Sequence, residues 1–127
     1  HVFVTERHLA TLTTQRPDGT PHVDPVGFTW DPDQGVLRIT TRHTSAKVRN
    51  IEAAIKAHGV ARAAVCQVDG GRWLTLEGTI TVARERDEVL EAMRRYAARY
   101  RTLTEDPRRV VLRLAADRVM GSAYMTR

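Results

Sequence analysis

Cysteine is scarce in this 127-residue sequence, and long apolar runs are absent. The one cysteine, Cys66, excludes an internal disulfide framework and is typical of the reducing cytoplasm, where we expect the protein to reside. No stretch approaches the roughly 20 apolar residues of a membrane span, and none has the pattern of a signal peptide. We therefore predict a single globular domain over residues 1–127, with one core and no membrane partner.

The usual signatures of catalysis and metal binding are missing as well. The five histidines share no ligand spacing with a cysteine or a carboxylate, so no metal site is expected. No Walker, Rossmann or G-x-S-x-G pattern occurs, and Cys66 has no activating neighbour. The sequence offers no nucleophile. Hydride transfer on a bound cofactor needs none, so this class of reaction stays open.

Basic residues outnumber acidic ones by 20 to 15, and their placement is uneven. No acidic residue occurs between Asp33 and Glu52. Four basic residues fall inside this acid-free window: Arg38, Arg42, Lys47 and Arg49. A basic window of this kind holds anions through its field, and nucleic acid, phosphate or a carboxylate would each suit it.

Short β-rich segments separated by turn residues predict an antiparallel meander. The expected strands are residues 8–15, 22–30, 36–41, 60–68, 72–83 and 109–115, with a short tail from Val119. Pro25 cannot donate to a strand ladder, so its strand is expected at an edge, bulged, or open toward a ligand. Gly78 predicts a bulge or a close backbone approach within the strand at 72–83.

Two segments show helical spacing. The first follows Thr44-Ser45, either of which could cap it, and it stops at Gly59, which favours the left-handed conformation. The second spans residues 87–101 and carries an apolar stripe that is expected to lie opposite its charged residues. This stripe consists of Val89, Met93, Tyr96 and Tyr100.

The order of these elements predicts a mainly β fold with two or three helices. Six or so antiparallel strands, with one helix after the third and one after the fifth, suggest a small barrel whose closure removes exposed edges. Side chains fill the interior of so small a barrel. A sizeable ligand must therefore lie outside it, and the groove of a dimer is the expected place.

The acid-free window also predicts a local anion site. The strand at 36–41 ends in Thr40-Thr41, and Lys47 lies in the first turn of the helix that starts near Ser45. N–H groups at a helix start, hydroxyl groups and an ammonium together can hold a phosphate. A cation in a first turn opposes the helix dipole, which makes sense if an anion lies between them. The alternative is an ordinary solvated helix start.

A second candidate is the pair Arg72-Trp73, which follows the expected turn at 69–71 and is preceded by Gln67. An arginine can clamp a carboxylate, and a tryptophan can cover a flat ring. A tryptophan on a strand more often belongs to the core or to a dimer interface, so both interpretations stay open. His22 is singled out because it opens the strand that Pro25 interrupts.

Several segments together resemble a known family. The run HLATLTTQRPDGTPHVDPVGFTWD, followed by TTRHTSAKVRN and QVDGGRWLTLEG, is similar to the split β-barrel flavin and deazaflavin oxidoreductases related to pyridoxamine 5′-phosphate oxidase. Within that family, ERHLA, VGFT, QVDG-x-RWL-x-LEG and RYRT are most similar to the branch that binds coenzyme F420 and includes biliverdin reductases. The likeness covers nearly the whole chain.

The resemblance implies a homodimer with coenzyme F420 bound at the subunit interface. The residues that would hold the cofactor phosphate are Thr40, Thr41, Ser45, Lys47 and Asn50. A basic rim that includes Arg42 would suit its anionic tail. The segment that would run beside the deazaflavin ring contains His22, Val23, Pro25 and Val26. The residues that would complete the site from the partner chain are Gln67, Arg72 and Trp73.

The reaction that the resemblance implies is hydride transfer from C5 of reduced coenzyme F420 to the C10 methine of biliverdin, which gives bilirubin. Arg72 is the first candidate for a catalytic cation near the tetrapyrrole. Three alternatives remain: an FMN-dependent oxidoreductase of the pyridoxamine-phosphate type, a cofactor carrier, and a basic barrel that binds single-stranded nucleic acid. Aromatic residues make up only 6% of the chain, which argues against nucleic acid.

Overall fold

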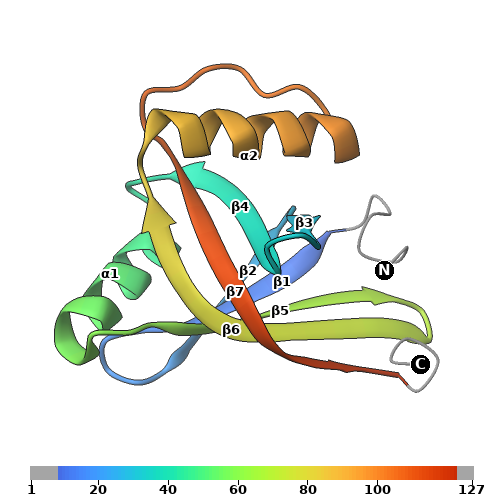
Figure 1. Ribbon diagram of the computed structural model, residues 1–127. Coiled ribbons are helices and arrows are strands. Elements are labelled where there is room, and N and C mark those ends of the chain that lie inside the picture. The colour runs from blue at the N-terminus through green and yellow to red at the C-terminus, as the bar shows by residue number, and fades with distance from the viewer. Residues whose placement is uncertain (1–8, 123–127) are drawn as a thin grey trace.

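Seven strands and two helices make up residues 9–122, the part of the chain that the computed structural model describes (Figure 1). The strands are β1 (Ala10–Gln15), β2 (Pro21–Val26), β3 (Thr29–Asp31), β4 (Val36–Arg42), β5 (Arg62–Asp69), β6 (Arg72–Ala83) and β7 (Arg109–Gly121). The helices are α1 (Ala46–His58) and α2 (Arg86–Arg99), and neither of these described helices is long and apolar enough to cross a membrane. The predicted mainly β fold with two helices is confirmed.

The strands form one antiparallel sheet in the order β2-β1-β5-β6-β7-β4-β3, which curls around its own inner face (Figure 1). Among residues 9–122 no ladder joins the two end strands, β2 and β3. The expectation of a closed barrel without edges is therefore wrong, because the barrel is open between these strands. Gly27 and Phe28 alone link β2 to β3, so the two edges approach each other where the chain passes between them.

Most expected strands are confirmed, with two differences. The strand expected at 22–30 is divided into β2 and β3, and Pro25 lies on β2, an edge strand, as predicted. The last strand does not stop at residue 115, because β7 pairs with β4 at one end and continues along β6 to Gly121. His8 of the first expected strand, and residues 123–127 of the expected tail, lie outside the described residues.

Gly78 allows β6 to pass close to β7. The pairing register shifts between Glu77 and Gly78, and a Cβ at Gly78 would lie only 2.0 Å from the carbonyl oxygen of Ala115. The predicted bulge and the predicted close approach both occur. A bulge increases the bend of its strand, and β6 and β7 carry the curl across the sheet (Figure 1).

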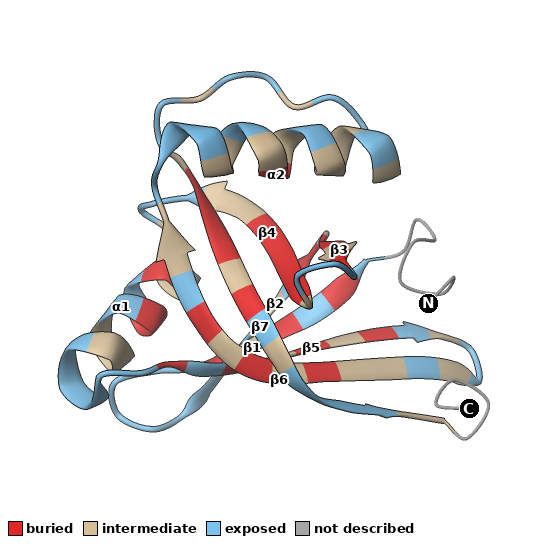
Figure 2. Ribbon diagram, viewed as in Figure 1, coloured by how far each residue is buried: buried red, intermediate tan, exposed pale blue. Residues whose placement is uncertain are grey.

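The core fills the inside of the curl, and α1 packs against it through β1 and β6 (Figure 2). Val48 and Ile51 of α1 are fully buried there with apolar residues of the sheet. These sheet residues include Leu12, Val65, Ile80, Leu112 and Leu114. Gly59 ends α1 in the left-handed conformation, and its N–H donates to the carbonyl oxygen of Ile55, as predicted.

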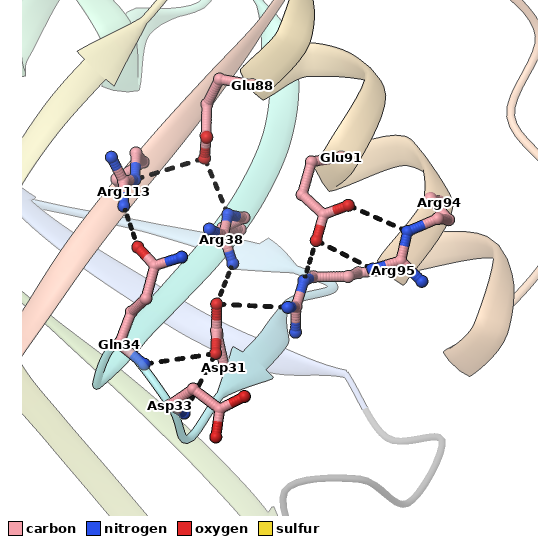
Figure 3. Close-up of polar contacts among 9 residues, drawn as sticks. All are labelled: Asp31, Asp33, Gln34, Arg38, Glu88, Glu91, Arg94, Arg95 and Arg113. Atoms are coloured by element: carbon pink, nitrogen blue, oxygen red, sulfur yellow. Dashed lines mark hydrogen bonds and ion pairs between the residues drawn. The ribbon is translucent and has the colours of Figure 1, made fainter.

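Helix α2 is attached to the sheet in a different way. Ala92 is its only buried residue, and the expected apolar stripe is half-buried. Charged residues face the sheet as well: Glu88 contacts Arg38, and Arg95 contacts Asp31 (Figure 3). The expectation that the charged residues of this helix lie opposite its packed face therefore fails for Glu88 and Arg95. Ion pairs fasten α2 to strands β3 and β4.

Candidate functional site

Lys47 belongs to the first turn of helix α1, and its side chain contacts strand β2. Its Nζ is 2.6 Å from Oδ2 of Asp24, and the two side chains are 14% and 32% exposed. Alternate residues of a strand point to the same side, and His22, Asp24 and Val26 are the less exposed residues of β2. They therefore share the side of β2 that faces α1 and the core. Residues 34–51 contain no acidic residue in the sequence, but the fold brings the Asp24 carboxylate to Lys47 of this window.

The end of β4 lies beside the start of α1. The Thr41 hydroxyl donates to Ser45 Oγ at 3.4 Å, and the N–H of Ser45 donates to the carbonyl oxygen of Arg42 at 3.0 Å. The first turn of α1 contains no acidic residue, and Ser45 makes no capping hydrogen bond through its side chain. The first N–H groups of α1 can therefore donate hydrogen bonds to an anion beside Lys47, which is the arrangement that the sequence predicts.

Arg38 does not take part in this anion site, although it belongs to the acid-free window. Only 3% of the residue is exposed, and its guanidinium lies 3.0 Å from Asp31 and 2.7 Å from Glu88 (Figure 3). Burial alone would raise the pKa of Asp31, but hydrogen bonds from Arg38 and from the N–H of Gln34 hold this pKa below its ordinary value. The buried pair is thus charged and structural.

Arg42, which the sequence predicts for a basic rim, is exposed next to the start of α1. Its side chain is 62% exposed, and its Nε lies 3.2 Å from Oδ2 of Asp106. Hydrogen bonds from Arg108, together with the one from Arg42, lower the pKa of Asp106. Asp106 therefore stays ionised and ties the loop before β7 to this rim.

The remaining predicted site residues on α1, β2 and β4 are buried to different extents. Asn50 is buried, and its Nδ2 donates to Thr14 Oγ1 on β1 at 3.2 Å. His22 is opposite Thr14 in the register of β1 and β2, and its Nδ1 is buried without a hydrogen-bond partner among the described residues. Val23 and Pro25 are exposed on the outer side of β2. Thr40 is half-buried on β4.

Gln67, Arg72 and Trp73 all lie on the hairpin formed by β5 and β6. The predicted tight turn is confirmed, because Asp69 pairs with Arg72 across Gly70-Gly71. Arg72 also forms an ion pair with Asp69. Successive strand residues point to opposite faces, so Arg72 and Trp73 cannot hold one ligand from the same side. Gln67 is 1% exposed and Trp73 37% exposed, which places Trp73 on the outer face.

The structure does not bring the two groups of predicted residues together within one chain. Helix α1 lies on the left of Figure 1, whereas the turn between β5 and β6 lies on the far right, near the described end of β7. The start of α1, the end of β4 and strand β2 form one cluster. A site that also uses the β5–β6 hairpin requires two chains.

Sequence spacing missed the residues that fix this region in place. Asp24 is 23 residues from Lys47, and Arg99 and Tyr100 contact the backbone of Phe28 from 71 and 72 residues away. Such contacts leave no local pattern in a sequence. The RYRT segment, which begins at Arg99, and the VGFT segment, which contains Phe28, pointed to these residues only through the family resemblance.

Comparisons with known proteins identify the family of this fold. The family model described as pyridoxamine 5′-phosphate oxidase matches residues 1–122. The F420H(2)-dependent biliverdin reductase of Mycobacterium tuberculosis (strain CDC 1551 / Oshkosh) is 48% identical over 121 residues, which are 95% of this chain and 84% of that protein. A solved structure named F420 Reductase has a TM-score of 0.72 and 25% identity, with 94% of each chain covered.

A more distant solved structure shows the same fold. The General Stress Protein 26 from Bacillus anthracis str. Sterne matches with a TM-score of 0.73 and 19% identity, over 94% of this chain and 88% of that one. The curled open sheet with two helices is therefore shared well beyond close relatives. The expected split barrel is confirmed, and the chain belongs to the pyridoxamine 5′-phosphate oxidase family.

Proposed function

We propose that this protein is a coenzyme F420-dependent oxidoreductase that reduces biliverdin to bilirubin. The observation that carries the proposal is the 48% identity, over 95% of the chain, to a relative named for this activity. The fold neighbour named F420 Reductase supports the same cofactor. The single cysteine supports a cytoplasmic protein, and we propose that residues 1–127 act as one domain.

The residues at the start of α1 fit the phosphate of coenzyme F420. Lys47 supplies an ammonium, Thr41 and Ser45 supply hydroxyl groups, and the first N–H groups of the helix point toward the same place. The Lys47 ammonium lies 2.6 Å from the Asp24 carboxylate, and this contact with an anionic oxygen supports an anion-binding role for the lysine. Thr40 of β4 and the buried Asn50 of α1 would support these phosphate-binding residues. Arg42 would face the anionic tail of the cofactor.

Strand β2 would flank the ring of the cofactor. Pro25 carries no N–H, and with Val23 it gives the exposed side of β2 an apolar surface on which a flat ring can lie. His22 and Val26 would shape the strand from its other side. Coenzyme F420, bound in its reduced form, supplies the hydride for the methine bridge of biliverdin. The protein residues would bind and orient the cofactor and the substrate, and would exclude water from them.

We infer that two copies of the chain form the complete site. Val68 and Trp73 are paired on neighbouring strands, and Met120 is opposite Thr75, two residues from Trp73. Residues two apart on a strand share a face, so these three exposed apolar side chains form one patch on β5, β6 and β7. Exposed apolar patches mark interaction surfaces. A second copy seated there would bring the β5–β6 hairpin to the α1 cluster of its partner through the face that carries Trp73, whereas Arg72 and the buried Gln67 lie on the other face of the hairpin.

Arg72 is our candidate for the cation that faces the substrate. Its side chain is 32% exposed and is held by Asp69 on the same hairpin, so it is oriented without being buried. A guanidinium suits the carboxylates of a tetrapyrrole because it can form two parallel hydrogen bonds. Arg72→Ala should raise the KM for biliverdin while the affinity for coenzyme F420 changes less.

A fluorescence titration with coenzyme F420 and with FMN tests the cofactor. FMN is the specific competitor, because the same phosphate cradle would hold it and the family takes its name from pyridoxamine 5′-phosphate oxidase. Tighter binding of coenzyme F420, followed by bilirubin formation from biliverdin with the reduced cofactor, would support the proposal. Tighter binding of FMN would contradict it. Binding of coenzyme F420 without turnover would indicate a carrier or a different acceptor.

A further inference from the structure

The end of α2 contacts the short link between the two edge strands. The Tyr100 hydroxyl accepts a hydrogen bond from the N–H of Phe28 at 3.2 Å and lies 3.1 Å from the carbonyl oxygen of the same residue, to which it can donate. A Cβ on Gly27 would lie 3.3 Å from the rings of Tyr96 and Tyr100. These rings therefore pack directly on the glycine, and α2 fixes the path of the chain between β2 and β3.

Arg99 joins this link to strand β5. Its Nη1 donates to the carbonyl oxygen of Phe28 at 2.6 Å, and its Nη2 donates to Oε1 of Gln67 at 2.8 Å. The guanidinium carbon also lies 4.6 Å from the ring centre of Phe28 and 5.0 Å from that of Tyr100. Phe28 and Gln67 are each 1% exposed. Hydrogen bonds from a charged donor and cation–π contacts are strongest in such a dry environment.

Among the described residues, sheet hydrogen bonds hold strand β2 on one side only, so the strand gains from this support. It pairs with β1 and ends the sheet, and Gly27 follows it directly. A displacement of the link would therefore move β2, and with it Asp24, relative to Lys47 on α1. Under the proposed function, residues 22–26 flank the cofactor ring, so such a displacement would alter the cofactor site.

We propose that Arg99 is a positioning residue, which holds the β2–β3 link and Gln67 so that residues 22–26 form one wall of the cofactor site. The inference rests on the proposed function, and Arg99 acts through Phe28 and Gln67. Helix α2 has separate anchors in the ion pairs of Glu88 and Arg95 (Figure 3). Replacing Arg99 should therefore leave the helix attached to the sheet.

Hydrogen–deuterium exchange of the purified protein tests the positioning role without any cofactor. Arg99→Met removes the charge and the hydrogen bonds to Phe28 and Gln67 but keeps a long side chain. We expect faster exchange at the amides of residues 22–28 and unchanged exchange in β6 and β7. Arg94→Met is the matched control, because Arg94 lies on the same helix, is exposed and pairs with Glu91. It should leave the exchange of residues 22–28 unchanged.

Titration of the same variants with coenzyme F420 and FMN tests the consequence for the site. Arg99→Met should bind the cofactor preferred by the wild type about tenfold more weakly, the effect expected for the loss of a charge-assisted hydrogen bond. Arg99→Lys should recover part of the affinity, because its ammonium can still donate to Phe28. Tyr100→Phe removes only the hydroxyl and should shift exchange and affinity in the same direction, which provides a second test if Arg99→Met does not fold.

The outcomes separate this inference from the proposed function. Unchanged exchange at residues 22–28, or exchange that rises equally in every strand, would overturn the positioning role. Faster local exchange with unchanged cofactor affinity would overturn the inference that Arg99 shapes the cofactor site. If the wild type binds neither coenzyme F420 nor FMN, the proposed function fails, and the exchange experiment alone decides whether Arg99 positions the β2–β3 link.

Discussion

The ammonium of Lys47 lies 2.6 Å from the carboxylate of Asp24, and this contact joins the first turn of α1 to the edge strand β2. The pair is only partly buried, with the Asp24 side chain 32% exposed. Ion pairs in contact with water contribute roughly 0–1 kcal/mol to stability. An anionic ligand can therefore replace Asp24 at Lys47 at little cost to the fold.

Lys47→Ala should weaken the binding of coenzyme F420 by roughly 1.5–3 kcal/mol, because it removes a charge-assisted hydrogen bond to the phosphate. The free energy of unfolding should change by no more than about 1 kcal/mol. Fluorescence titration and urea unfolding measure the two effects. Lys56→Ala is the control, since Lys56 is exposed near the other end of α1. Equal affinity of both variants would mean that the phosphate lies elsewhere.

Asp24→Asn should strengthen cofactor binding by up to about fivefold, the factor that corresponds to an exposed ion pair. The substitution keeps the shape of the side chain but removes the charge that competes with the phosphate for Lys47. The same titration measures the change. Weaker binding would instead show that the Asp24 carboxylate orients Lys47 for the ligand.

Arg38→Met should lower the free energy of unfolding by about 3–5 kcal/mol, because it leaves the Asp31 carboxylate buried without its main charged partner. Asp31 is 1% exposed and lies 3.0 Å from Arg38. Arg94→Met, which breaks an exposed pair with Glu91, should cost no more than about 1 kcal/mol. Urea unfolding compares the variants, and similar losses would argue against a structural role for the buried network.

Stability should fall in acid as the Glu91 carboxylate, which pairs with Arg94 and Arg95 on the same helix, becomes protonated. Hydrogen bonds from Arg94 and Arg95 lower the pKa of Glu91 from 4.5 to about 2. A group with a lowered pKa in the folded state contributes its stability above its unfolded pKa and loses it as pH falls through the folded value. The free energy of unfolding should therefore decline between about pH 4.5 and pH 2, and Glu91→Gln should flatten part of this decline. A pH-independent difference between Glu91→Gln and the wild type would contradict the assignment.

Gly78→Ala should destabilise the protein by about 3 kcal/mol or more, at the upper end of what overpacking costs. The added Cβ would lie 2.0 Å from the backbone oxygen of Ala115, and a backbone atom cannot move aside easily. Gly71→Ala is the matched control, because nothing lies within 4 Å of a Cβ there. Thermal unfolding of the two variants checks the expectation, which fails if both melt alike.

Features that depend on one residue or its neighbours could be predicted from the sequence. Pro25 cannot donate to a ladder, so its place on an edge strand was predictable, and so was the close approach at Gly78. Gly70-Gly71 placed the hairpin turn correctly. The contact between Thr41 and Ser45 was also predictable, because these residues are close along the chain.

Features that depend on the curl of the sheet could not be predicted in this way. Arg38 belongs to the basic window in sequence, yet β4 turns it inward to Asp31 and Glu88. Helix α2 shows an apolar stripe, yet its charged residues hold it to the sheet, because strands β3 and β4 present buried charges to it.

The sequence by itself determined most of the strands, the hairpin turn at Gly70-Gly71, a helix start at Thr44 or Ser45 and the segments that mark the family, since each follows from local backbone preferences or from contiguous residues. The tertiary structure alone decided that Asp24 faces Lys47 and that Arg99 holds Phe28 and Gln67. These partners lie tens of residues apart. Only the packing of α1 and α2 against the open, curled sheet brings them within hydrogen-bonding distance.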